Sequence, residues 1–442
     1  MSRVDGVGEA PSAERPTMPV LIVAVSPGCL ARVGGLPLVV RAVLALRAAG
    51  FPEIAMFARS PTEAAVALLT GRGVERELRW IHGAVDATAA AGSDAVLVLS
   101  ADLLFDPRAL SPLVGPVRAG AMRLGIARAA PDADTRVAVC SATIVPALVA
   151  RFSAGSPSLA RALREIGAPT EPPRVLGPEL YLPLDGTRSP RLLTHGLLAD
   201  LARRTAQSDG YLAARLDRHV SRFLSTVLVG WPVTPNQITV ASIIVGLAGA
   251  AMLATVSYGG RLAGVLALIV SSILDGVDGE VARARFEESP GGARLDLAGD
   301  YAAHLATFVG LGIGLARGGL PRTGVWAAVA LVAGVGAAMA AMHALVVRPT
   351  LTTTGDLHGS TDTAPGVVQR LAGRDYTYLL LLFALVGHLE WFVYAAAVGS
   401  WVFALGLLVR AAVRRRPPLG QSAGATGGAG MVSQGRNGAP PR

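Results

Sequence analysis

The stretch SSILDGVDGEVARARFEESPGGARLDLAGDYAAH, residues 271–304, decides the fold of the C-terminal half of this chain. It places Asp275, Asp278, Asp296 and Asp300 between two long apolar runs. Ionisable side chains at membrane depth are costly, so their presence indicates a functional site. The spacings i,i+3 and i,i+4 put each pair on one face of its helix. If the two helices are antiparallel neighbours, the spacing predicts one polar pocket that holds all four carboxylates.

Four carboxylates in one pocket repel one another, and divalent cations remove that repulsion. Oxygen ligands favour Mg²⁺ or Mn²⁺ over zinc. Two metals bridged by carboxylates are suited to phosphoryl transfer, because they bind the phosphate oxygens while charge shifts. The alternative interpretation of the four aspartates is a cation pathway or a set of structural ion pairs.

Several residues around the aspartates fit a phosphate site. Gly279 and Gly292 have no side chain, and Ala282 has a small one, so a nucleotide or another helix can approach closely. Arg283 offers a forked cation where a pyrophosphate would lie. Ser289 adds a hydroxyl in the connecting loop.

Outward from this stretch the chain is strongly apolar, and we predict an all-α membrane domain over residues 207–416. Each predicted span is near the roughly 20 residues that a bilayer requires. The six predicted transmembrane helices are residues 237–257, 261–282, 299–317, 324–347, 375–389 and 391–412.

Six spans put both ends of the membrane domain on one side. Arginines after the last span predict that this side is cytoplasmic, as do those of the 348–374 connection. Arg317 and Arg322 fall on the opposite side, against the positive-inside rule. The protein is therefore expected to be a multi-pass integral membrane protein of a bacterial inner membrane, with both termini cytoplasmic.

A segment before the first span, residues 207–226, mixes arginines with apolar residues at helical spacing. This pattern predicts an amphipathic interfacial helix whose arginines reach lipid headgroups. The alternative is a plain surface helix. The apolar runs that follow favour the interfacial interpretation.

The N-terminal part of the chain has a different pattern. Strand-like runs at 20–26, 53–58 and 94–100 alternate with helical runs at 38–49 and 61–70. Such alternation predicts a soluble α/β domain, over residues 18–184, with a parallel sheet. We expect residues 185–206 to be a linker, and residues 1–17 and 417–442 to be disordered, with no cleaved signal peptide.

Composition excludes several classes of function. The chain has 442 residues, is 52% hydrophobic and carries a net charge of +9. All 40 basic residues are arginine, so neither a P-loop nor a Schiff-base mechanism is available. No basic stripe with interleaved aromatics is present, so we expect no nucleic-acid partner. Two cysteines make no disulfide framework.

Asp275, Asp278, Gly279, Ala282, Arg283, Gly292, Asp296 and Asp300 satisfy every spacing of the pattern Asp-x₂-Asp-Gly-x₂-Ala-Arg-x₈-Gly-x₃-Asp-x₃-Asp. The chain therefore resembles the CDP-alcohol phosphatidyltransferases from about residue 209 to residue 416. The resemblance includes residues 234–239 at the first span and residues 373–375 before the fifth.

The resemblance implies a role for each matched residue. Asp275, Asp278 and Asp296 would ligate two divalent cations, Mg²⁺ or Mn²⁺. Asp300 would ligate one cation and act as the general base on the acceptor hydroxyl. The implied CDP contacts are Pro235, Asn236, Gln237, Thr239, Gly279, Ala282, Arg283, Ser289 and Gly292.

The implied partners are a CDP-linked donor, an alcohol or polyol-phosphate acceptor, and the lipid bilayer. CMP would be the leaving group, and the family implies a homodimer. Arg348 and Arg374 are candidates for binding an acceptor phosphate, although loop arginines are also topological anchors. A non-catalytic membrane scaffold or cation carrier is the alternative function.

Residues 27–38 resemble part of the sugar-phosphate nucleotidyltransferases through their Val-Gly-Gly-x-Pro-Leu turn, Val33 to Leu38. The Gly-rich loop is almost wholly missing, and Pro27-Gly28 replaces a Pro-Lys pair. Both losses remove phosphate-binding groups. Asp102 matches the place of a metal-binding aspartate, although it also fits a polar residue at a strand end.

The fused arrangement resembles bifunctional inositol-1-phosphate cytidylyltransferase and di-inositol-phosphate-phosphate synthase. In that family the soluble half makes CDP-inositol and the membrane half uses it. We expect a degenerate soluble domain that keeps the fold without the activity. A bifunctional enzyme is the alternative.

Overall fold

The computed structural model describes residues 18–414, apart from 52, 59–77, 91–93, 127–134, 178, 185–187, 206–210 and 348–374. The described residues divide into two compact units. One unit lies within Met1–Gly249, Gly264–Ala303 and Pro365–Leu379, and the other within Ala250–Ala263, His304–Ala364 and Leu380–Arg442. The predicted helix at 61–70, Arg348 and Arg374 lie outside the described residues, as do 1–17 and 417–442.

The first unit contains the predicted α/β domain, which is built on a seven-stranded sheet in the order β10-β8-β9-β6-β1-β4-β5. The central strands are close to those predicted from the sequence. The strands of this sheet are β1 (Val20–Ala24), β4 (Ile54–Ala58), β5 (Leu78–Trp80), β6 (Ala95–Ser100), β8 (Met122–Ile126), β9 (Val137–Ser141) and β10 (Thr170–Val175).

The sheet is mixed, whereas the sequence predicted a parallel one. Strands β6, β1, β4 and β5 are parallel, but β9 runs antiparallel to both of its neighbours. The short connection between β8 and β9 explains the difference, because a parallel crossover requires a dozen or more residues and usually a helix.

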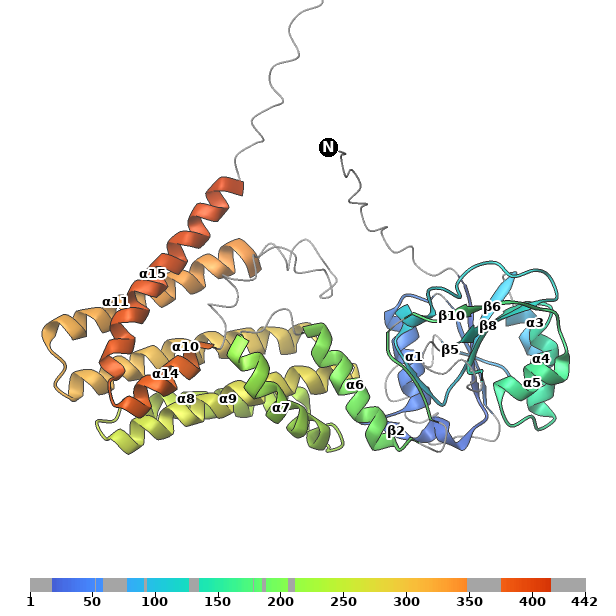
Figure 1. Ribbon diagram of the computed structural model, residues 1–442, viewed down its shortest axis with the longest axis horizontal. Helices are drawn as coiled ribbons and strands as arrows, with labels where there is room; N and C mark the ends of the chain where they lie inside the picture. The colour runs from blue at the N-terminus through green and yellow to red at the C-terminus, as the bar shows by residue number, and fades with distance from the viewer. Residues whose placement is uncertain are drawn as a thin grey trace, which may run out of the picture. The chain divides into compact units, whose positions relative to one another are not determined.

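Both faces of this sheet are buried. Val20, Ile22 and Ala24 of β1 belong to one apolar cluster, and Leu21 and Val23 belong to the other. Successive side chains of a strand point to opposite faces, which is why β1 is a continuous apolar run. Helix α1 (Leu38–Ala48) covers one face, and α3 (Ala84–Ala90), α4 (Val145–Ser153) and α5 (Leu159–Ile166) lie on the other (Figure 1).

Short elements complete the α/β domain. Strands β2 (Arg32–Val33) and β3 (Leu36–Pro37) form a small hairpin, and β7 (Leu103–Phe105) pairs with β11 (Tyr181–Pro183). The 3-10 turns are η1 (Pro27–Leu30) and η3 (Pro107–Leu110). Most of the expected linker is helical, because α6 (Pro190–Thr205) buries leucines such as Leu193 and Leu198.

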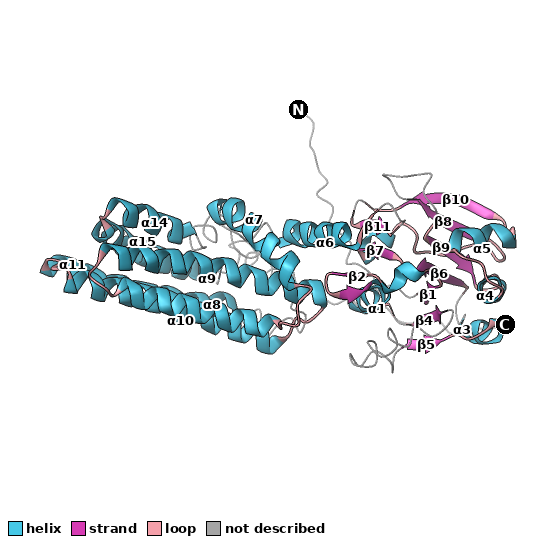
Figure 2. Ribbon diagram, turned by 90° about the horizontal axis from the view of Figure 1, so that it is seen from below, coloured by secondary structure: helices cyan, strands magenta, loops and turns pink. Residues whose placement is uncertain are grey.

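The C-terminal part is helical (Figure 2). Its elements are α7 (Tyr211–Leu228), α8 (Pro235–Leu253), α9 (Tyr258–Arg285), α10 (Pro290–Arg317), α11 (Arg322–Met342) with a π-helical turn (His343–Val347), α14 (Asp375–Val386) and α15 (Leu389–Arg414).

Among the described residues, four helical segments are long and apolar enough to cross a membrane. They are Pro235–Leu253, Tyr258–Arg285, Arg322–Leu345 and Leu389–Val409. The predicted spans at 299–317 and 375–389 correspond to α10 and α14, which are helical but are not in this group. Helix α14 has 12 residues, fewer than the roughly 20 that a span requires.

Candidate metal centre

The aspartates lie on two helices, in segments that belong to the first unit. Helix α9 supplies Asp275 and Asp278, and α10 supplies Asp296 and Asp300. A short loop after Arg285 reverses the chain between them, and α10 begins at Pro290. The Ser289 hydroxyl accepts a hydrogen bond from Gly292 N at 3.0 Å, so Ser289 caps the start of α10.

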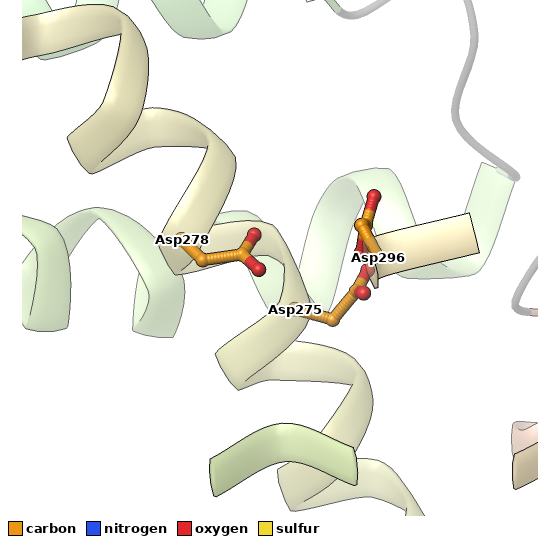
Figure 3. A group of neighbouring side chains, drawn as sticks. All are labelled: Asp275, Asp278 and Asp296. Atoms are coloured by element: carbon orange, nitrogen blue, oxygen red, sulfur yellow. The ribbon is translucent and has the colours of Figure 1, made fainter. Parts of the chain in front are cut away.

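Asp275, Asp278 and Asp296 converge. Each offers one carboxylate oxygen, and these oxygens lie within 4.8 Å of one another. Figure 3 shows the two α9 carboxylates directed towards Asp296 on α10. Asp278 is buried, and the other two are half-buried. The local helical spacing and the pairing of two helices together produce this arrangement.

Asp300 lies one turn after Asp296 on α10 and is half-buried. It is not a member of the group of three converging carboxylates. Its predicted roles as the fourth ligand and as the general base therefore stay predictions.

The hydrogen bonding of the centre fits a cation. The Thr239 hydroxyl, on α8, donates to Asp278 Oδ2. Among the described residues, Asp296 Oδ1 is buried and has no hydrogen-bond partner. A buried carboxylate oxygen accepts only, and leaving it unsatisfied costs free energy. A hard divalent cation between the three carboxylates would remove their mutual repulsion, and a cation bound through Asp296 Oδ1 would also satisfy this oxygen.

The start of α8 lies against the start of α10. A Cβ added at Gly292 would lie 2.9 Å from Asn236 Oδ1 and 3.1 Å from Ser289 Oγ. Three predicted CDP contacts therefore meet at one place. Since even a methyl group would crowd Asn236 there, the glycine permits this close approach.

Some predicted CDP contacts have a structural role in the described residues. Gln237 Oε1 accepts from Thr234 N at 3.0 Å, while Gln237 N donates to Thr234 Oγ1 at 3.3 Å. These reciprocal bonds form a capping box at the start of α8. Arg283 lies close to Gly279, because a Cβ added at Gly279 would be 3.2 Å from Arg283 Nη1. Arg283 Nε is buried without a hydrogen-bond partner among the described residues. The CDP roles themselves stay predictions.

Two charged residues of α9 were not singled out from the sequence. Glu280 is buried, and it accepts hydrogen bonds from Ser225 at 2.6 Å and Ser221 at 3.3 Å, both on α7. Arg285 is also buried and donates to the backbone carbonyls of Leu228, the last residue of α7, and of Val229. The signal was available, since an ionisable residue in an apolar helix indicates a specific partner.

Asp102 lies just beyond the carboxyl end of β6 and is 1% exposed. The Ser100 hydroxyl donates to it at 2.6 Å, and Arg136 forms an ion pair with its other oxygen. The guanidinium supplies the positive charge that a metal would otherwise provide. The metal-binding role of Asp102 stays a prediction.

The C-terminal part of the chain is similar to known proteins. Residues 232–410 match the model of the CDP-alcohol phosphatidyltransferase family. The "Bifunctional IPC transferase and DIPP synthase" of Aquifex aeolicus is 41% identical over 88 residues, which are 20% of this chain and 19% of that protein. The protein of the same name from Archaeoglobus fulgidus is 35% identical over 118 residues, 27% of this chain and 23% of that protein. The matched segments thus span a small part of these relatives.

Two solved structures show a partial similarity to this chain. Phosphatidylinositol phosphate synthase (PgsA1) of Mycobacterium tuberculosis, in complex with manganese and citrate, has 22% identity and a TM-score of 0.34, covering 42% of this chain and 87% of that one. The inositol-1-phosphate CTP transferase from T. maritima has 18% identity and a TM-score of 0.30, and the match covers 39% of this chain and 91% of that one.

Proposed function

We propose, from the premise that residues 232–410 form a CDP-alcohol phosphatidyltransferase domain, that this chain transfers a substituted phosphate from a CDP-linked donor to an alcohol and releases CMP. The convergence of Asp275, Asp278 and Asp296 within 4.8 Å is the observation that carries the proposal. The buried, unpartnered oxygen of Asp296 supports it.

The chain's own residues suggest how the reaction is organised. Asp275, Asp278 and Asp296, with Asp300, would hold two divalent cations, which supply charge neutralisation for the diphosphate when bound. The Thr239 hydroxyl orients Asp278. Asp300, one turn along α10, would accept the proton of the acceptor hydroxyl as that oxygen attacks the β-phosphorus.

The test is CMP release by the purified full-length chain with Mn²⁺ or Mg²⁺. CDP-diacylglycerol, CDP-inositol and CDP-glycerol are the donors, each paired with inositol phosphate or glycerol phosphate. Asp278→Asn should abolish release, whereas Asp86→Asn, an exposed aspartate on α3, should leave it unchanged. If no pair supports metal-dependent CMP release, or if Asp278→Asn stays active, the proposal is wrong. The active pair identifies the donor class.

We further propose that the α/β domain is not a cytidylyltransferase in this chain. The pairing of Asp102 with Arg136 supports this, because that carboxylate is already neutralised. Incubation of the full-length chain with CTP, Mg²⁺ and inositol phosphate should release no pyrophosphate. Release at a rate comparable to the CMP reaction would instead favour a bifunctional enzyme.

We propose, as the sequence suggested, that α10 and α14 join the four apolar segments to make six spans with both termini cytoplasmic. Large apolar side chains left exposed on α15, including Val398, Val402 and Leu405, support contact with lipid. Cysteines introduced at Gly319 and Ser422 would then label with impermeant maleimide from opposite sides of the membrane. Labelling of both from one side contradicts this topology. The homodimer stays a prediction.

We also propose that α7 lies in the membrane interface. Val220, Phe223 and Val227 are exposed at i, i+3 and i+7, while Ser221 and Ser225 are buried. One face of the helix is thus apolar and uncovered within the described residues. A nitroxide attached at Phe223→Cys should be accessible to oxygen dissolved in lipid. The same label at Val85→Cys, an exposed position in the α/β domain, should not be, and equal accessibility would contradict the proposal.

A further inference from the structure

An arginine of the α/β domain binds the C-terminal end of the helix that carries Asp275 and Asp278. Helix α9 ends at Arg285, and the last four carbonyls of a helix have no partner within it. Arg41 Nη2, from α1, donates to the carbonyl oxygen of Ala284 at 2.5 Å. The positive guanidinium also complements the negative end of the helix dipole. Arg41 is 4% exposed, so water screens these contacts little.

The turn that resembles the nucleotidyltransferases holds this arginine in place. Arg41 Nη2 donates to Val33 O at 2.8 Å and to Gly34 O at 3.1 Å, and Arg41 Nε donates to Val33 O at 3.2 Å. Gly34 and Gly35 have φ angles of 56° and 80°, which glycine adopts readily. The three bonds and the tight turn fix the direction of the guanidinium.

The same turn packs against the segment that follows α7. A Cβ added at Gly35 would lie 2.4 Å from Val229 O and 3.1 Å from Arg285 Nε. Gly34 N donates to Thr194 Oγ1 of α6 at 3.1 Å. There is therefore no room for a side chain at Gly35, where the turn lies against Val229 and Arg285. The turn serves as a contact surface.

Arg285 makes similar contacts at the C-terminal end of α7. Its guanidinium donates to Leu228 O at 2.9 Å, Val229 O at 2.8 Å and Val233 O at 2.6 Å. One arginine therefore binds the end of α9, and the last residue of α9 binds the end of α7. Buried apolar residues around these bonds, among them Val33, Val229 and Ala284, belong to one cluster.

The junction lies close to the metal centre along the chain. Ala284 follows Asp278 by six residues, about 9 Å along a helix at 1.5 Å per residue. Phe286, with φ 54°, begins the loop to α10, and its ring centroid is 5.5 Å from Arg41 Cζ. Arg41 thus contacts both the last turn of α9 and the loop that brings Asp296 beside α9.

We propose that the α/β domain acts as a positioning element, with Arg41 capping α9 and so maintaining the convergence of its carboxylates with Asp296. The inference rests on the proposed function, because it assigns the α/β domain a role in the same metal centre.

The experiment measures Mn²⁺ binding by electron paramagnetic resonance on the purified full-length chain. Arg41→Met should weaken Mn²⁺ binding by about fivefold or more, the lower end of usual coupling between sites. Arg41→Lys keeps the charge without the fork, so its affinity should be intermediate. Arg47→Met, on the exposed side of α1, is the matched control and should bind as the wild type does.

Hydrogen–deuterium exchange of the amides in residues 279–289 provides a second measurement on the same samples. Exchange should accelerate in Arg41→Met and not in Arg47→Met. If Arg41→Met does not purify as a folded chain, Arg41→Lys carries both measurements.

The outcomes separate the two proposals. If the wild type binds no Mn²⁺, or if Asp278→Asn binds it equally well, the proposed function is wrong. If the wild type binds Mn²⁺, Asp278→Asn does not, and the Arg41 variants match the wild type in affinity and exchange, the positioning role of Arg41 is overturned while the proposed function stands.

Discussion

The hydroxyl of Thr239 offers the sharpest single perturbation of the metal centre. It donates to Asp278 Oδ2, and Thr239 is buried on α8. Thr239→Val keeps the shape of the side chain and removes the donor, so the carboxylate loses the group that orients it. Thr239→Ser keeps the hydroxyl and serves as the control.

The size of the effect follows from the type of bond. A hydrogen bond to a charged group contributes about 1.5–3 kcal/mol. At about 1.4 kcal/mol per factor of ten, this corresponds to roughly 10- to 150-fold in an equilibrium constant. Outer partners of metal ligands typically change metal affinity or activity by about 10- to 100-fold. We therefore expect Thr239→Val to weaken Mn²⁺ binding by about tenfold.

The assay compares the Mn²⁺ titration with the rate of CMP release in the same preparations. If Thr239 orients Asp278, Thr239→Val shifts the metal titration, and saturating Mn²⁺ restores part of the rate. If Thr239 instead contacts only the CDP moiety, the KM of the donor rises and the metal titration does not move. A metal titration of Thr239→Val that overlays the wild type would refute the reasoning.

Two further predictions concern the α/β domain. Burial alone would raise the pKa of Asp106, but hydrogen bonds from Arg108 and the charge of Arg204 outweigh it and lower that pKa. Because the pKa of Asp106 is lower in the folded chain, this carboxylate stabilises the domain at pH values above its unfolded pKa of about 3.9. That stabilisation is lost as the pH falls through the folded pKa. Asp106→Asn should therefore lower the free energy of unfolding by about 0.5–2 kcal/mol at pH 7, the range for a lost helix cap. The difference in melting temperature between the variant and the wild type should shrink below pH 4. A difference that does not depend on pH would contradict this. Burial, with the charge of Asp102, raises the pKa of Cys29 to about 11, and burial raises that of Cys140 to about 12. Ellman's reagent at pH 8 should therefore label neither thiol until the chain is denatured, and stoichiometric labelling of the folded chain would show that the site is open.

In the α/β domain, the positions of strands could be predicted from the sequence, but their pairing directions could not. The strand predicted at 94–100 is β6 (Ala95–Ser100), because a continuous apolar run between turn residues is a local signal. The antiparallel direction of β9 was not predicted, since pairing direction depends on the length of a connection and on neighbours distant in the chain.

In the metal centre, too, some features follow from the local sequence alone. That Asp275 and Asp278 share one face of α9 follows from helical periodicity alone, and so does the pairing of Asp296 with Asp300 on α10. The spacing of Thr234 and Gln237 also predicts a capping box, although Gln237 was singled out only as a CDP contact. These features depend only on residues that are close in sequence, and they can therefore be predicted from the sequence.

Other features appear only in the folded chain. The approach of Asp296 to the α9 carboxylates, and the place of Asp300 outside that group, depend on the packing of α9 against α10. The binding of Arg136 to Asp102 and of Arg41 to Ala284 joins residues 34 and 243 positions apart. The sequence by itself determined which side chains share a helix face and that the centre is acidic. Tertiary structure decided which of them meet, because contacts between elements depend on packing that no short stretch of sequence specifies.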